Sequence, residues 1–212
     1  MRLPRIILAD DHGLFVEALC KLAAPHFEIV ATVGDGRALL EIAPTVKSDV
    51  VVIDVGMPLL NGLDAGRELK KKLPNMKLIF LTMNEDPDLA VEAMKAGASG
   101  YLLKTSAGSE LFSAIRAALR GKSYITPQIA RGMQESFIQH PRGAKRDKSL
   151  TPRQREVVQL LAEGKPMKVV ADILKIAPRT VAFHKYRVMQ DLGIRTNAEL
   201  IQFAIKKRII VQ

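Results

Sequence analysis

Residues 50–58 read Val-Val-Val-Ile-Asp-Val-Gly-Met-Pro, an unbroken apolar run that ends on an aspartate and then turns. Further short apolar runs occupy residues 5–9, 28–33, 77–81 and 100–103. Amphipathic segments separate these runs, with apolar residues at three- and four-residue steps. Five strands alternating with five helices are typical of α/β proteins, and near-continuous apolar strands fit a sheet covered on both faces. We therefore expect a five-stranded, doubly wound parallel sheet.

Beyond this α/β region the chain changes character. Residues 122–148 contain turn-forming and basic residues around Pro141, and we expect them to be a linker. Residues 149–212 show only helical patterns, beginning with a Thr-Pro pair at Thr151 that is typical of a helix start. We expect a first domain over residues 1–121 and a second, small all-α domain of four helices over residues 149–212.

Charge is distributed unevenly along the 212 residues. Residues 1–121 hold 14 basic and 15 acidic residues, whereas residues 142–212 hold 16 and 6, so the whole excess of +10 lies in the last third. Such asymmetry indicates a polyanionic partner, and without a Trp anchor nucleic acid is favoured over a membrane surface. No apolar run approaches the roughly 18 residues that span a bilayer, so we expect a soluble cytoplasmic protein.

Cysteine and histidine chemistry is not indicated. Cys20 is the only cysteine, which excludes an internal disulfide and a cysteine-based metal site. The four histidines show no pair at ligand spacing, so we expect no histidine metal site.

Polar side chains stand at the carboxyl ends of four predicted strands. Asp10 and Asp11 follow the first strand, while Asp54, Thr82 and Lys104 end the third, fourth and fifth. Because the carboxyl ends of parallel strands share one edge of the sheet, these side chains should converge where ligands of open α/β folds bind. Crowded carboxylates repel one another unless a cation joins them, and oxygen ligands suit Mg²⁺. The pattern predicts a magnesium site.

The same pocket predicts phosphoryl chemistry. Asp54 can act as a nucleophile towards a phosphoryl group and form an aspartyl phosphate, while Mg²⁺ held by Asp10 and Asp11 neutralises the incoming oxygens. Lys104 would pair with the phosphate as a point charge, and Thr82 would offer its hydroxyl to a phosphoryl oxygen.

The segment 166–192 has the lengths of a helix-turn-helix. In its second helix Val181, Val188 and Leu192 share one face, with Lys185 at the margin. The opposite face carries Arg179, Phe183, Tyr186, Arg187 and Gln190. A basic face with two aromatic residues one turn apart suits a helix that enters the major groove, and packing against the linker or a second subunit is the alternative.

Four segments at the strand ends resemble the receiver domain of bacterial two-component response regulators, a flavodoxin-like fold. They are residues 8–12 (Leu-Ala-Asp-Asp-His), 52–58 with Asn61-Gly62 after it, 81–83 (Leu-Thr-Met) and 100–104 (Gly-Tyr-Leu-Leu-Lys), and the match covers about residues 4 to 121. The resemblance implies that Asp54 accepts phosphate from a sensor histidine kinase. It further implies that Asp10, Asp11, Asp54 and the Gly56 carbonyl hold Mg²⁺, and that Thr82, Tyr101 and Lys104 relay the switch.

The helical segment resembles the LuxR-type helix-turn-helix. The match rests on residues 150–157 (Leu-Thr-Pro-Arg-Gln-Arg-Glu-Val), 160–164 (Leu-Leu-Ala-Glu-Gly) and 192–194 (Leu-Gly-Ile), and it covers about residues 149 to 209. Together with the helix face described above, it assigns DNA contacts to Lys168, Arg179, Thr180, Ala182, Phe183, Lys185, Tyr186, Arg187 and Gln190. Ala182 stands where a DNA-contacting lysine is frequent in the family, so Ala182, Phe183 and Tyr186 would read bases through apolar contacts or one hydroxyl.

Both resemblances together predict a response regulator of the NarL/FixJ type, which is a transcription regulator and not an enzyme. Phosphate on Asp54 would control homodimerisation and promoter binding through the helix at 178–192. The expected partners are promoter DNA carrying an inverted repeat, a sensor histidine kinase and, as a further candidate, RNA polymerase. The alternative is a ligand-responsive or constitutive LuxR-type regulator that phosphate does not gate. A phosphatase is disfavoured because Gly56 stands where aspartyl hydrolases carry a second aspartate.

Overall fold

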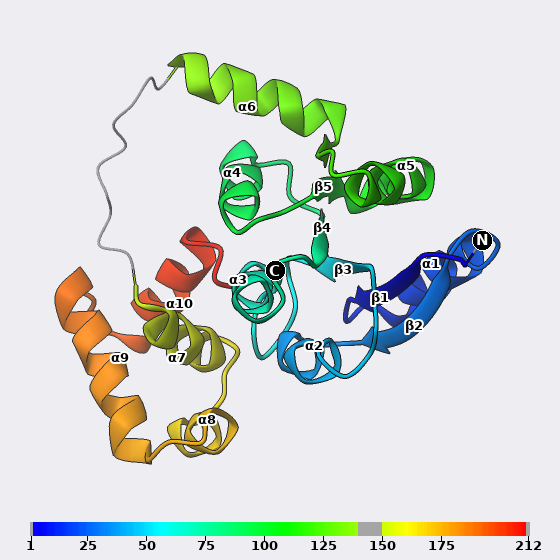
Figure 1. Cartoon of the computed structure of the whole chain (residues 1–212). Helices are drawn as coiled ribbons and strands as arrows, with labels where there is room; N and C mark the ends of the chain where they lie inside the picture. The colour runs from blue at the N-terminus through cyan, green and yellow to red at the C-terminus, as the bar shows by residue number, and fades with distance from the viewer. Residues whose placement is uncertain (1, 140–149, 211–212) are drawn as a thin grey trace. The chain divides into compact units, whose positions relative to one another are not determined.

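The computed structural model describes residues 2–139 and 150–210, which fall into two compact units (Figure 1). The strands of the first unit are β1 (Arg5–Ala9), β2 (Glu28–Val33), β3 (Val50–Asp54), β4 (Lys77–Thr82), β5 (Gly100–Leu103) and β6 (Tyr124–Ile125). Its helices are α1 (Gly13–Ala23), α2 (Gly36–Ile42), α3 (Gly62–Lys72), α4 (Pro87–Lys95), the 3-10 turn η1 (Lys104–Ser106), α5 (Ala107–Leu119) and α6 (Pro127–Gln139). The second unit consists of α7 (Pro152–Ala162), α8 (Met167–Leu174), α9 (Pro178–Leu192) and α10 (Asn197–Lys206).

The strands of the first unit form one parallel sheet in the order β2-β1-β3-β4-β5-β6. From β1 the chain moves to one side to form β2 and then to the other side to form β3, so the winding direction reverses between β1 and β3. In open α/β sheets ligands bind outside the carboxyl ends of the strands at such a reversal. The doubly wound parallel sheet predicted from the sequence is confirmed, and its switch point coincides with the ends of β1 and β3.

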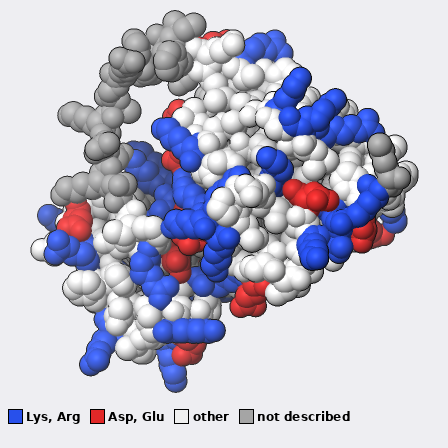
Figure 2. Space-filling model, viewed as in Figure 1, with Lys and Arg blue, Asp and Glu red and all other residues white. Residues whose placement is uncertain are grey.

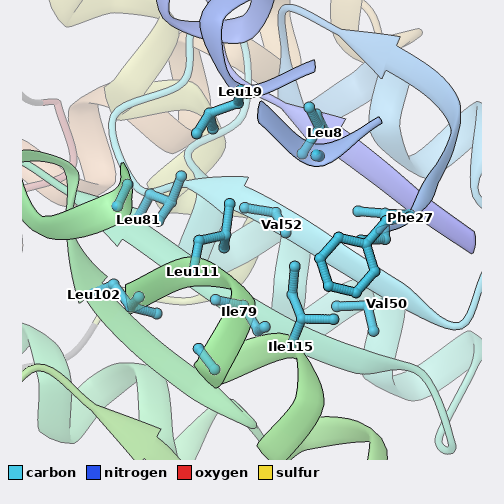
Figure 3. Packing of buried hydrophobic residues seen from close by; sticks show 14 of the residues in the cluster. Leu8, Leu19, Phe27, Val50, Val52, Ile79, Leu81, Leu102, Leu111 and Ile115 are labelled. Carbon is cyan, nitrogen blue, oxygen red and sulfur yellow. The ribbon is translucent and has the colours of Figure 1, made fainter. Parts of the chain in front are cut away.

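One face of the sheet is covered by α1 and α5. Leu8 and Val52 from the strands pack with Leu19 of α1 and with Leu111 and Ile115 of α5 in a continuous buried cluster (Figure 3). Burying each such side chain stabilises the fold by roughly 1.5–3 kcal/mol. The cluster spans β1, β3 and both helices, so it holds the strand ends that carry the polar residues in a fixed relation.

On the other face, α3 approaches β4 closely. A Cβ atom added at Gly66 would lie 2.5 Å from Cζ of Phe80, a separation that real Cβ atoms do not show. Phe80 is fully buried, so the glycine is what lets the helix lie against its ring.

The expected linker from residue 122 and the count of five strands differ from the structure. Residues 124–125 form β6, which adds to the edge at β5, and α6 packs against α4. Thr126 explains the attachment: its backbone N–H donates to Tyr101 and its hydroxyl donates to the Glu110 carboxylate at 2.8 Å. A two-residue strand has no periodicity to detect in sequence. The rest of the expected linker, residues 140–148, lies outside the described residues.

The four predicted helices of the second unit are present. At the start of α7, Thr151 accepts from the backbone N–H of Gln154 and the Gln154 side chain accepts from Thr151 N–H, a capping box. Val157, Val170 and Val181 bring α7, α8 and α9 into one buried cluster. This cluster fixes the angle between α8 and α9, which together form the helix-turn-helix.

None of the helices in the described residues is long and apolar enough to cross a membrane.

Candidate functional site

The polar residues at the strand ends converge as the topology requires. Asp10 follows β1, Asp54 ends β3, Thr82 ends β4 and Lys104 follows β5, and all four are buried. Asp11 stands beside Asp10 and is exposed. The cluster is therefore closed towards the sheet and open towards solvent on the Asp11 side.

Lys104 holds the two buried carboxylates together. Its Nζ lies 2.8 Å from Asp10 Oδ2 and 2.9 Å from Asp54 Oδ2. Charge-assisted contacts of this length are strong in a desolvated site, and the ammonium prevents the carboxylates from facing each other unpaired. Three carboxylates and one ammonium still leave an excess of two negative charges at this edge of the sheet.

This excess fits a divalent cation. Asp10, Asp11, His12 and Asp54 each offer one donor atom, and these atoms lie within 4.8 Å of one another. Hard divalent cations prefer several oxygen ligands of this kind. The donor set and the charge thus both match the cation expected from the sequence, and its ligands would be the three carboxylates.

The burial of Asp54 changes its acidity. Burial raises the pKa of Asp54 above its ordinary value, the Lys104 ammonium opposes the rise, and the nearby Asp10 carboxylate adds to it. A hydrogen bond from the backbone of Gly56 also favours the ionised form. The Asp54 carboxylate is consequently more basic than that of an exposed aspartate.

The turn after β3 brings Gly56 and the start of α3 against Asp54. A Cβ atom added at Gly62 would lie 2.0 Å from the backbone carbonyl oxygen of Asp54, so only glycine fits at this position. Asn61 caps α3 by accepting from the backbone N–H of Asp64 at 2.9 Å. These contacts fix the backbone on both sides of the acceptor aspartate. The role of the Gly56 carbonyl as a cation ligand stays a prediction.

Thr82 and Tyr101 lie behind the carboxylates. The Thr82 hydroxyl accepts from the backbone N–H of Asn84 at 2.9 Å. Tyr101 is fully buried, and its hydroxyl has no hydrogen-bond partner within the described residues. Burial raises the pKa of Tyr101 to about 12, and the neighbouring Thr82 side chain opposes that rise. Thr82 therefore occupies the space between the pocket and a ring held in the core.

His12 is a residue of this site that the sequence reasoning missed. The absence of a histidine pair at ligand spacing predicts no histidine metal site, and this stays a prediction. The structure places His12 Nδ1 3.0 Å from Asp10 Oδ1 and 3.0 Å from Asp11 Oδ1. One feature of the sequence could have indicated the contact: His12 directly follows the pair Asp10-Asp11. A search for pairs of histidines does not detect this feature.

The exposed face of α9 carries most of the predicted DNA contacts. Val181 and Val188 are buried, while Phe183 and Tyr186 on the other face are 64% and 59% exposed. The exposed residues among the predicted contacts are Lys168 on α8 and Arg179, Phe183, Tyr186, Arg187 and Gln190 on α9. Figure 2 shows lysine and arginine side chains projecting from this helical unit.

Three of the predicted contacts are less accessible. Thr180 and Ala182 are half-buried. Lys185 is buried, with Nζ 5.3 Å from the centre of the Tyr186 ring, because it lies one turn after Val181 on the packed side of the helix. Lys185 thus lies on the packed side of the margin that its spacing predicts, and its ammonium lies over the face of the Tyr186 ring. Its contact with DNA stays a prediction.

Comparison with known proteins places both units in families. The model "Response regulator receiver domain" matches residues 6–116, and the model "Bacterial regulatory proteins, luxR family" matches residues 148–204. The chain belongs to the response regulators that join a receiver domain to a LuxR-family DNA-binding domain, and it is thus a transcription regulator of a two-component system. Receiver domains generally bind Mg²⁺ at an acidic pocket, and this chain carries such a cluster.

Its relatives match along nearly the whole chain. It is 32% identical to the uncharacterized transcriptional regulatory protein YxjL of Bacillus subtilis, with 97% of each chain covered. It is 29% identical to the response regulator GacA of Pseudomonas aeruginosa, again over 97% of each. Among solved structures, the chain is similar to RcsB of Salmonella enterica serovar Typhimurium bound to promoter rprA in the presence of the phosphomimetic BeF3−. The sequence identity is 26% and the TM-score is 0.62, with 95% of this chain and 98% of the RcsB chain covered.

Proposed function

We propose that Asp54 accepts a phosphoryl group from a phosphohistidine of a sensor kinase. A carboxylate oxygen of Asp54 would form the new bond to phosphorus while the phosphorus–nitrogen bond of the donor breaks and its imidazole takes up a proton. The observation that supports this most directly is the Lys104 ammonium, which lies 2.9 Å from Asp54 Oδ2 and is thereby placed to pair with a phosphoryl oxygen. A divalent cation held by Asp10, Asp11, Asp54 and the Gly56 carbonyl would supply further charge neutralisation.

Thr82 and Tyr101 would carry the change away from the pocket. In the unmodified protein the Thr82 hydroxyl accepts from Asn84 N–H. A phosphoryl group on Asp54 offers stronger acceptor oxygens, so the Thr82 hydroxyl would turn and donate to it. Tyr101 lies in contact range of Thr82 with an unpartnered hydroxyl, and its position would follow that movement. The surface near β4 and β5 would have two arrangements, and phosphorylation of Asp54 would change their relative stability.

The output of this switch is DNA binding by α9. Arg179, Arg187 and Lys168 would pair with backbone phosphates, while Phe183 and Tyr186 would touch base edges in the major groove. Lys185 would contribute indirectly, by holding the Tyr186 ring in position. A homodimer would bind an inverted repeat with half-sites about one helical turn apart. We place this activity in the cytoplasm, with RNA polymerase as a further candidate partner, and assign no enzymatic turnover.

Selection of genomic DNA fragments on the full-length protein, with and without Mg²⁺ plus beryllium fluoride, tests the switch. Enrichment of an inverted repeat only with beryllium fluoride, lost in Asp54→Asn and kept in the exposed-carboxylate control Glu41→Gln, is the expected outcome. Equal enrichment without the mimic would show a constitutive regulator. Small-molecule dependence that persists in Asp54→Asn would show a ligand-responsive one.

The DNA-reading face is tested with the selected fragment. Arg179→Ala should weaken binding to specific and unrelated DNA alike and lower the salt slope by about one, whereas Phe183→Ala and Tyr186→Ala should also relax sequence preference. Lys206→Ala, an exposed lysine on α10, is the matched control. Unchanged binding by all three α9 variants would remove this face from the interface.

A further inference from the structure

The exposed face of α9 is apolar over its middle turns. Phe183 and Tyr186 are 64% and 59% exposed, which makes them the two most exposed large hydrophobic residues in the described part of the second unit. Val181 and Val188 of the same helix are fully buried in the core, and this packing fixes the side of the helix that carries the two rings. Apolar side chains that lie together on a surface in this way mark an interaction site.

Both rings are held in place by neighbouring side chains. The Lys185 Nζ lies 5.3 Å from the centre of the Tyr186 ring, and Lys185 is itself buried. The His184 ring packs edge-on against Phe183, with the ring centres 5.6 Å apart and the planes at 68°. Side chains that are already held in one arrangement lose little conformational freedom when they bind a partner. The two rings are therefore preorganised as contact groups.

The side chains at the centre of this face are poorly suited to the polar edges of bases. Ala182 and Phe183 have no hydrogen-bonding group, and Tyr186 has a single hydroxyl. Polar readout in the major groove uses side chains such as Arg, Asn and Gln, which form paired hydrogen bonds to one base. The arginines of this face, Arg179 and Arg187, precede and follow the aromatic pair in the helix. The face thus combines charge for the phosphate backbone with an apolar centre.

One group in the major groove matches an apolar centre. Among the four bases only thymine presents an apolar group there, its C5-methyl, and alanine and phenylalanine are side chains that contact it. 5-Methylcytosine carries the same methyl group at the same ring position. Cytosine has no methyl group and presents an amino donor at this edge. An amino group covered by the Phe183 ring would lose its hydrogen bond to water without replacement, so cytosine is disfavoured.

We propose that α9 recognises pyrimidine C5-methyl groups in its DNA site, with Phe183 and Tyr186 as the contacting rings and Ala182 as a smaller apolar contact beside them. The proposal rests on the proposed DNA-binding function and adds the chemical group that the helix selects. Thymine is the source of this methyl group in unmodified DNA, so each half-site should contain thymine at one or two positions that face α9. Removing one buried methyl group should weaken binding about three- to tenfold.

Replacing thymine by deoxyuridine removes the C5-methyl group and leaves the hydrogen-bonding edge of the base unchanged. The fragment enriched by the full-length protein with Mg²⁺ and beryllium fluoride is synthesised with deoxyuridine at each thymine in turn, and fluorescence anisotropy measures the affinities. We expect the loss of about three- to tenfold at one or two positions of each half-site. At these positions 5-methylcytosine should bind more tightly than cytosine, which distinguishes the methyl group from the rest of the thymine ring.

Variants of α9 show whether the rings sense the methyl group. In Phe183→Ala or Tyr186→Ala the affinity for thymine DNA should fall, and the deoxyuridine penalty at the corresponding position should shrink to less than about twofold. Phe183→Leu keeps an apolar side chain and should retain most of the penalty. Arg179→Ala is the matched control on the same face, and it should weaken binding to the thymine and deoxyuridine forms by the same factor.

The outcomes separate methyl recognition from DNA binding. If the protein binds its selected fragment but the half-sites contain no thymine, or no deoxyuridine substitution weakens binding by more than about twofold, the inference is refuted and DNA binding stands. The same conclusion follows if the penalty is equal in the wild type, Phe183→Ala and Tyr186→Ala, because it then comes from the shape of the DNA. If no DNA fragment is enriched, the proposed function fails together with the inference.

Discussion

Replacing Lys104 by methionine tests the electrostatic balance of the carboxylate pocket. Lys104 lies 2.8 Å from Asp10 and 2.9 Å from Asp54, and the three side chains are only 6%, 3% and 5% exposed. Removing the cation of such a buried group leaves uncompensated charge, which costs about 3–5 kcal/mol while the carboxylates stay ionised. We expect the free energy of unfolding of the receiver unit to fall by about this amount near neutral pH without added cation.

The loss of stability should depend on pH, because protonation of Asp54 removes its unpaired negative charge. Burial already raises the pKa of Asp54 above its ordinary value and Lys104 opposes the rise, so the variant raises this pKa further. A carboxyl with a higher pKa in the folded state contributes stability below its unfolded pKa and loses it as pH rises through the folded pKa. The difference from wild type should thus be small near about pH 4 and grow towards about pH 8.

Urea unfolding of the full chain, followed by hydrogen exchange in peptides from β3 and β4, reports on the receiver unit alone. In a double-mutant cycle with Asp54→Asn, the combined loss should be smaller than the sum of the single losses, because both changes remove one contact. Lys71→Met, at an exposed lysine paired with Glu68, should change stability by less than about 0.5 kcal/mol. A loss that is independent of pH, or strictly additive, would refute the reasoning.

Three further changes test local features. Gly62→Ala should destabilise the receiver unit by at least about 2 kcal/mol, because its Cβ would meet the Asp54 carbonyl oxygen. Gly13→Ala is the control, since a Cβ there meets nothing within 4 Å, and urea titration compares the stability of the two variants. Tyr101→Phe removes a buried, unpartnered hydroxyl and should raise stability at neutral pH by about 1 kcal/mol. In a spectrophotometric titration, the variant should lack the tyrosine ionisation whose pKa is about 12. It should also unfold less at alkaline pH, because the wild type loses stability as the pH rises through this pKa. Lys175 ends α8 with φ of 53°, a left-handed backbone conformation that favours glycine. Thermal melts should therefore show that Lys175→Gly stabilises the second unit by about 1 kcal/mol. An equal gain from Lys175→Ala would contradict the backbone explanation.

Much of the site could be predicted from sequence because parallel topology is a strong constraint. Once β1, β3, β4 and β5 are known to run parallel, Asp10, Asp54, Thr82 and Lys104 must share one edge of the sheet, whatever the helices do. The helices of the second unit were predictable for a local reason: prolines and glycines mark their ends. The roles assigned to these residues stay predictions until they are tested.

Other features depended on contacts that leave no pattern. The strand β6 has two residues, and its pairing with β5 depends on Thr126 reaching Glu110. Lys185 looks like one more basic residue of a DNA-binding helix, yet its position one turn from Val181 places it on the packed side. The contacts of the His12 ring with Asp10 and Asp11 follow no histidine spacing, so no sequence pattern indicated them.

Sequence alone was enough to predict the parallel sheet, the helical second unit, the polar residues at the strand ends and the location of the positive charge. These follow from hydrophobic periodicity, helix-end residues and composition, all of which are local properties of the chain. The folded structure was needed to show which polar groups pair and which are buried. Distances such as the one from His12 Nδ1 to Asp54 depend on how distant segments pack, because a shift of about 1 Å in a helix makes or breaks a hydrogen bond without altering any sequence pattern.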